Sequence, residues 1–324
     1  MARIEAIAAG AGPGYGGGKM GRRSRRWSVP LRSPALFAVP LLALATPACA
    51  QPAPATDADP ALWVVKDKDT TVYLFGTIHV LKPGLTWFDE GVKTAFDASQ
   101  TLVLEMVEPD AATQQKVVAA KAFAPAAPAL STRIQAKYRG TLATAMNKTG
   151  LPQTAWEKMQ PWFAAVTLSL VPVQEQGYEP ANGPEKVLTD AAKAQGKAVV
   201  GLETFEGQLS IFDTLSQPAQ VQLLESTIDE LPKSGETMAK MVADWSRGDP
   251  DALAAEMNDS LKDSPEVAKA LLTDRNRRWA GWIAERMKRP GTVFIAVGAG
   301  HLAGPESVQK MLGQYKLKAV RVKY

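Results

Sequence analysis

The stretch TVYLFGTIH, residues 71–79, joins an apolar run to a glycine and, three residues later, a histidine. A second stretch, TVFIAVGAGH at residues 292–301, ends in the same way, with Gly298 three residues before His301. Runs rich in β-branched and aromatic residues predict strands, so each histidine is expected just past a strand end. His79 and His301 are the only two histidines in the 324 residues. Because histidine titrates near neutral pH and is the commonest metal ligand, we expect both in one site.

Two further apolar runs end at a carboxylate. Residues 101–106 contain Glu105, and residues 198–202 are followed by Glu203. The first run is almost continuously apolar, which is typical of a strand buried on both faces. Ligands of open α/β sheets bind beyond the carboxyl ends of the strands, so these two glutamates should converge with the two histidines.

The remaining pattern predicts an α/β (α+β) fold with a central mixed sheet and flanking helices. Residues 62–65 should form a hairpin with 71–75, and residues 318–322 a last strand. A large helical insertion is expected from about 110 to 185, and a second helical block from 208 to 287. Apolar spacings of three and four predict helices over 89–98, 114–123, 130–148, 155–173, 185–195, 208–215, 218–231, 237–247, from 250 onward, 265–287 and 305–312.

The first fifty residues have the composition of an export signal. Five arginines between positions 22 and 32 precede an apolar run over 35–45, and Ala48-Cys49-Ala50 offers small residues for cleavage. Residues 1–19 contribute nothing to this signal, and Met20 is an alternative start. The apolar run is too short to span a bilayer. We therefore predict a periplasmic or secreted chain without a stable transmembrane anchor, a linker over 51–60 and a single domain over 61–324.

Charge and cysteine content restrict the chemistry of that domain. The full chain has 37 basic and 33 acidic residues; without the seven basic residues and one acid of positions 1–50, it has 30 and 32. The sequence thus predicts no basic surface for nucleic acid. The single cysteine, Cys49, lies in the signal, which excludes disulfides and thiol catalysis in the mature chain.

Two imidazoles and a carboxylate suit a divalent metal ion, with Mn, Co or Zn as candidates. In this interpretation His79 and His301 are ligands, and Glu105 is the third ligand or the general base. Glu203 takes whichever of these two roles Glu105 does not take. Alternatively, Glu203 and Thr204 only cap the helix that follows them. Gly76, Gly298 and Gly300 would let the backbone approach a bound group closely. Arg275, in an apolar helix, either forms a salt bridge or orients the substrate.

Five segments in order resemble the TraB/GumN family, which includes the Tiki proteins: residues 62–80, the LVLEM strand, GKAVVGLETFEGQLSIF, DRNRRWAGWI and FIAVGAGHLAGPESV. The resemblance implies metal-dependent proteolysis on a fold related to erythromycin-esterase and ChaN-like proteins. It also implies site roles for Gly76 with His79, Gly298 with His301, Glu105, Arg275 and Asn276. Many bacterial members have an aspartate near residue 183, where this chain reads Asn182-Gly183-Pro184-Glu185.

Three functions are consistent with these residues. The first is an exported metal-dependent hydrolase, a peptidase, acting on a peptide or small molecule. The second is a metal-free hydrolase in which a histidine acts as general base. The third is a non-enzymatic protein that binds a peptide, haem or metal ion in the same cleft.

Overall fold

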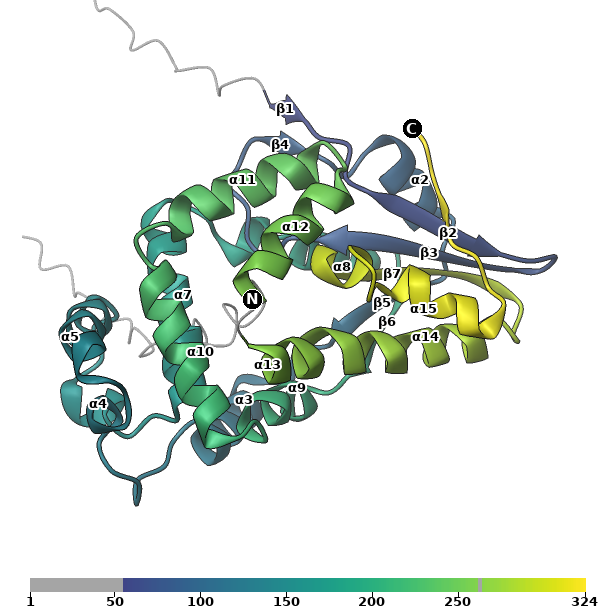
Figure 1. The fold of residues 1–324 in the computed structure, drawn as a ribbon. Helices are drawn as coiled ribbons and strands as arrows, with labels where there is room; N and C mark the ends of the chain where they lie inside the picture. The colour runs from purple at the N-terminus through teal and green to yellow at the C-terminus, as the bar shows by residue number, and fades with distance from the viewer. Residues whose placement is uncertain (1–54, 262–263) are drawn as a thin grey trace, which may run out of the picture.

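A computed structural model of the chain describes residues 55–261 and 264–324, so the predicted signal over 1–50 lies outside the described residues (Figure 1). A six-stranded sheet forms its centre, in the order β6-β5-β7-β3-β2-β8. The strands are β2 (Leu62–Lys66), β3 (Thr70–Thr77), β5 (Thr101–Met106), β6 (Ala198–Glu203), β7 (Gly291–Gly298) and β8 (Val320–Arg321). β3, β7, β5 and β6 run parallel, whereas β2 and β8 are antiparallel to their neighbours. The predicted mixed sheet is confirmed.

The register of β3 and β7 places the two Gly-x-x-His motifs side by side. Gly76 pairs with Val297, and Thr77 pairs with Gly298. The segments that carry His79 and His301 therefore leave the sheet next to each other, although 222 positions separate them in the sequence. β5 and β6 end at the same edge, because all four strands are parallel.

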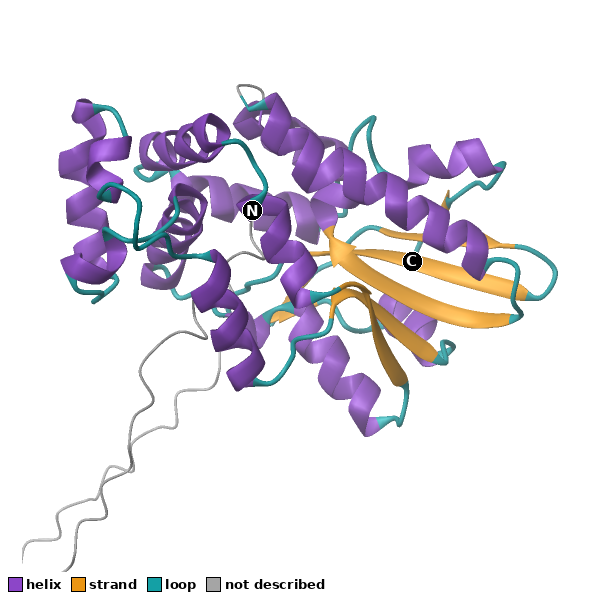
Figure 2. Ribbon diagram, turned by 90° about the horizontal axis from the view of Figure 1, so that it is seen from below, coloured by secondary structure: helices purple, strands orange, loops and turns teal. Residues whose placement is uncertain are grey.

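Both faces of the sheet are covered by helices (Figure 2). On one face α2 (Glu90–Asp97), α8 (Pro184–Ala194) and α11 (Ser234–Ser246) enclose an aromatic cluster of Phe75, Trp87, Phe96, Trp245 and Phe294. On the other face α14 (Asp274–Arg286) and α15 (Val308–Met311) cover the inner strands through Trp279, Ile283 and Val308. The helices thus remove the apolar faces of both central strands from water, which is the main stabilising term of such a layer.

A separate apolar core holds a helical block beside the sheet (Figure 1). It contains α3 (Ala111–Lys121), α4 (Leu130–Arg133), α5 (Arg139–Lys148), α6 (Gln153–Trp156), α7 (Pro161–Glu175), α9 (Phe205–Asp213) and α10 (Gln217–Glu230). The single helix predicted over 130–148 is wrong: α4 and α5 are separated at Ile134 and Gln135, which have extended backbone. The Glu225 carboxylate explains the break, because it accepts hydrogen bonds from Gln135 N and Nε2, each at 2.7 Å.

Two other helices also differ from their predicted bounds. The helix predicted over 155–173 is divided into α6 and α7, and Pro161 begins α7. The helix predicted over 265–287 comprises α13 (Pro265–Ala268), a π-helical turn over Lys269–Thr273 and α14. Such π-turns inside helices occur frequently at functional sites. α12 (Pro250–Leu261) precedes this segment and packs against α11.

Residues 55–60, the described part of the predicted linker, include a strand that pairs with the domain. β1 (Thr56–Asp57) pairs in parallel with β4 (Leu85–Thr86), and Ala58 is buried. Within residues 55–261 and 264–324, no helix has both the length and the apolar character that a membrane span requires.

Candidate functional site

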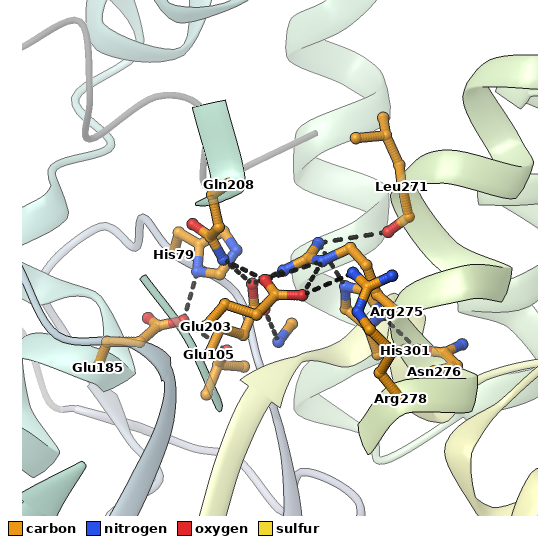
Figure 3. Close-up of polar contacts among 12 residues, drawn as sticks. His79, Glu105, Glu185, Glu203, Gln208, Leu271, Arg275, Asn276, Arg278 and His301 are labelled. Atoms are coloured by element: carbon orange, nitrogen blue, oxygen red, sulfur yellow. Dashed lines mark hydrogen bonds and ion pairs between the residues drawn. The ribbon is translucent and has the colours of Figure 1, made fainter. Parts of the chain in front are cut away.

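Side chains from the ends of β3, β5, β6 and β7 meet at one edge of the sheet (Figure 3). They are His79, Glu105, Glu203 and His301, and α14 adds Arg275 and Asn276 to them. The structure therefore brings together every polar residue that the sequence assigned to the site.

Arg275 is the centre of this network. Its Nη2 donates to Glu105 Oε2 at 2.6 Å and to Glu203 Oε2 at 2.8 Å, and its Nε lies 3.1 Å from both oxygens of Glu203. Burial alone would lower the pKa of Arg275, but the two carboxylates outweigh burial and raise it. Arg275 thus makes the buried salt bridge that was one of its two predicted roles, and it also lines a cavity.

Gln208 is a member of the network that the sequence did not reveal. Its Nε2 lies 3.1 Å from Glu105 Oε2 and 3.1 Å from Glu203 Oε2. Thr204, one residue after Glu203, caps α9 by accepting a hydrogen bond from Gly207 N at 3.0 Å. The capping role therefore belongs to Thr204, and this leaves the Glu203 carboxylate to face Arg275. A glutamine in the first turns of a helix carries no distinctive sequence signal.

His301 is held by partners at both ring nitrogens. Nδ1 lies 2.5 Å from Asn276 Oδ1, and Nε2 lies 3.1 Å from Arg275 Nη1. Asn276 Nδ2 donates to the Glu306 carbonyl at 2.7 Å, so Oδ1 is the atom that faces the ring. Because Arg275 can only donate, Nδ1 carries the proton and Nε2 is the acceptor. Burial, followed by the charge of Arg275, lowers the pKa of His301 well below 6.5.

His79 has a different partner. Its Nδ1 hydrogen bonds to Oε1 of Glu185, in the first turn of α8, and Thr77 Oγ1 donates to the same oxygen at 2.6 Å. Since a carboxylate accepts, Nδ1 carries the proton. His79 Nε2 makes no hydrogen bond to any residue that the structure describes, and His79 lines a cavity. The difference from the family pattern at Asn182–Glu185 put a carboxylate role there in doubt, yet Glu185 directly contacts His79.

The three glycines allow close packing around this network. A Cβ on Gly298 would lie 3.2 Å from Glu105 Oε1, 3.5 Å from His79 Nε2 and 3.7 Å from His301 Cδ2. A Cβ on Gly76 would lie 3.1 Å from Ala299 Cα, and one on Gly300 would collide with Met257. Gly298 N also donates to Glu105 Oε1 at 2.8 Å. Gly298 thus leaves a small space that both histidines and Glu105 border.

A cavity of about 750 Å³ opens from this space. His79, Glu105, Arg275 and His301 line its polar end, and the rest of its wall comes mainly from α10, α11, α12 and the π-helical turn. This volume lies within the usual range for sites that bind small molecules.

The network does not fit the metal ligand set expected from the sequence. Among the described residues, no group of three or more histidine, cysteine, aspartate or glutamate side chains is arranged to hold a metal ion. Both ring nitrogens of His301 contact protein groups, and the guanidinium of Arg275 lies beside its Nε2. A cation bound there would be repelled by Arg275.

Comparison with known proteins places the chain in a family. The sequence pattern that defines the TraB/PrgY/gumN family matches residues 61–321. The chain belongs to the TraB/PrgY/gumN family. Among its relatives, the uncharacterized protein YbaP of Escherichia coli K12 is 24% identical over 253 residues, which cover 78% of this chain and 92% of YbaP. An uncharacterized protein of Treponema pallidum is 22% identical over 277 residues, which cover 79% of this chain and 80% of that protein. No solved structure matches this member of the TraB/PrgY/gumN family.

Proposed function

We propose that the chain is a hydrolase that cleaves an amide or ester bond of a peptide or small molecule, with His79 as general base. The observation that carries this proposal is the His79–Glu185 pair at the polar end of the cavity. A carboxylate at Nδ1 fixes the tautomer and leaves Nε2 as the proton acceptor, which is the arrangement that a general base requires.

The proposed reaction needs only water as co-reactant. His79 Nε2 takes a proton from a water molecule, and the water oxygen attacks the carbonyl carbon of the substrate. The Glu185 carboxylate stabilises the imidazolium through Nδ1. The proton then passes from Nε2 to the leaving amine or alcohol as the bond to the carbonyl carbon breaks.

The other members of the network hold the site in place in this proposal. Glu105, Glu203 and Gln208 fix the guanidinium of Arg275, and Arg275 fixes His301. Because His301 is neutral and engaged at both nitrogens, its role is to position the segment around Gly298. No step above uses the divalent ion that the sequence led us to expect.

Turnover assays with wild-type protein and a His79→Gln variant test the proposal. The mature chain would be incubated with libraries of fluorogenic peptides and of nitrophenyl esters, with Lys186→Gln, an exposed change on α8, as control. We expect turnover by wild type and by Lys186→Gln, and none by His79→Gln. Equal turnover by His79→Gln would refute the role of His79, and binding without turnover would favour the non-enzymatic function.

We also propose export to the periplasm or the medium, supported by the arginine-rich and apolar composition of residues 1–50. Fractionation of cells that express the full chain should place the protein outside the cytoplasm. Retention in the cytoplasm of a chain that keeps residues 1–50 would contradict this proposal.

A further inference from the structure

Two neighbouring helices, α11 and α12, form one wall of the cavity. α11 contributes Ser234, Thr237, Met238 and Met241, whose spacing places them on one helical face. α12 contributes Leu253, Glu256 and Met257 at the same kind of spacing. An ion pair between Lys240 and Glu256 joins the two helices beside this wall. The wall therefore consists of two helices that an ion pair links and whose side chains face the cavity.

Three methionines belong to that wall: Met238, Met241 and Met257. Methionine is unbranched and has three rotatable side-chain bonds, so a methionine surface adapts to apolar groups of different shape. Met257 lies against Gly300, one residue before His301, so the wall extends to the reacting end of the cavity. We name Met238, Met241 and Met257 the methionine wall.

The cavity also has apolar side chains outside these two helices. Phe212, Leu271 and Leu272 line it, and the last two belong to the π-helical turn that precedes Arg275. The guanidinium at the polar end already faces two carboxylates, Glu105 and Glu203, so it does not attract an anionic ligand strongly. Charged side chains of both signs also line the cavity: Asp229, Glu230, Lys233, Glu236, Lys240 and Glu256. Lys240 and Glu256 pair with each other, and apolar atoms make up most of the exposed lining, so the cavity is best suited to an uncharged, largely apolar group.

We propose that the cavity binds an apolar aliphatic or aromatic group of the substrate next to the bond that is cleaved, and that the methionine wall determines this specificity. This inference rests on the proposed function, which supplies the bond that is cleaved. It adds the chemical class of the substrate group next to that bond. Rotation of the methionine side chains accommodates apolar groups of different shape, from linear to aromatic.

Binding of neutral primary amides tests the inference without requiring turnover. A series from butanamide to decanamide would be titrated by calorimetry into the full chain and into Met241→Gln, Met257→Gln and Met311→Gln. Glutamine has nearly the length of methionine but is polar. Met311, on α15, packs in the core on the other side of the sheet and does not line the cavity, which makes it the matched control.

We expect the dissociation constant to fall by up to about fourfold per added methylene until the cavity is filled. Met241→Gln and Met257→Gln should each weaken decanamide binding by at least about threefold, and Met311→Gln should leave it within about twofold of wild type. Affinity that is independent of chain length, or equal effects of all three substitutions, would overturn the inference. Chain-length dependence in a protein that hydrolyses no substrate would instead leave the inference intact and refute the proposed function.

Discussion

The protonation of His301 gives a prediction that needs no substrate. In the unfolded chain this histidine takes up a proton near pH 6.5, whereas burial and Arg275 keep the folded ring neutral to a much lower pH. The unfolded state therefore binds more protons than the folded state below about pH 6.5. By linkage, the free energy of unfolding falls as the pH decreases through this range.

The size of the effect follows from the single proton involved. Between pH 7.5 and pH 5.5, His301 should reduce the free energy of unfolding by about 1.4 kcal/mol. Urea unfolding of wild type and of His301→Gln at both pH values measures it. Glutamine does not titrate, so the variant should lose about 1.4 kcal/mol less than wild type over the same range, whatever its absolute stability.

Nuclear magnetic resonance with ¹⁵N-labelled histidine checks the same prediction directly. The chain contains two histidines, and a His79→Gln variant assigns the two signals. We expect His301 to keep the neutral tautomer with a protonated Nδ1 from pH 7.5 down to pH 5.5. A ring that titrates at pH 6.5 or above, or equal pH dependence of wild type and His301→Gln, would refute the reasoning about its burial and its contact with Arg275.

Three other substitutions test the rest of the network. Glu185→Gln removes a charge-assisted hydrogen bond worth about 1.5–3 kcal/mol, so kcat should fall by about 10- to 100-fold with little change in KM; an unchanged kcat would contradict the general-base role. Arg275→Met leaves two buried carboxylates without their cation and should destabilise the fold by about 3–5 kcal/mol in urea unfolding, whereas a loss below about 1 kcal/mol would contradict the buried salt bridge. Gly298→Ala places a methyl group 3.2 Å from Glu105 Oε1, so kcat should decrease while the free energy of unfolding changes little. An unchanged kcat would show that the reaction does not use the space beside Gly298.

The sequence predicted the convergence of the site because strand ends are local features. The runs before His79 and His301, with those at Glu105 and Glu203, have clear strand patterns, and parallel strands end at a common edge. The mixed sheet followed from the same patterns. Family resemblance added Asn276, whose amide holds His301 Nδ1.

The partners of these residues could not be predicted, because they depend on side-chain orientation across distant segments. Glu185 reaches His79 from a helix 106 positions away, and Gln208 bridges two carboxylates from a helix with no unusual pattern. The break between α4 and α5 likewise depends on Glu225, a residue 90 positions beyond Gln135. The sequence predicted a metal ligand at His301, but its contacts with Arg275 and Asn276 could not be predicted from residue types.

We propose that His79, oriented by Glu185, activates water without a metal ion. The most direct measurement is kcat of the mature chain, purified without a histidine tag, before and after exhaustive chelation, with elemental analysis of the same samples. We expect turnover to persist at a metal content far below one ion per chain and to disappear in His79→Gln. Turnover that is lost on chelation and restored by Mn²⁺, Co²⁺ or Zn²⁺ would contradict it.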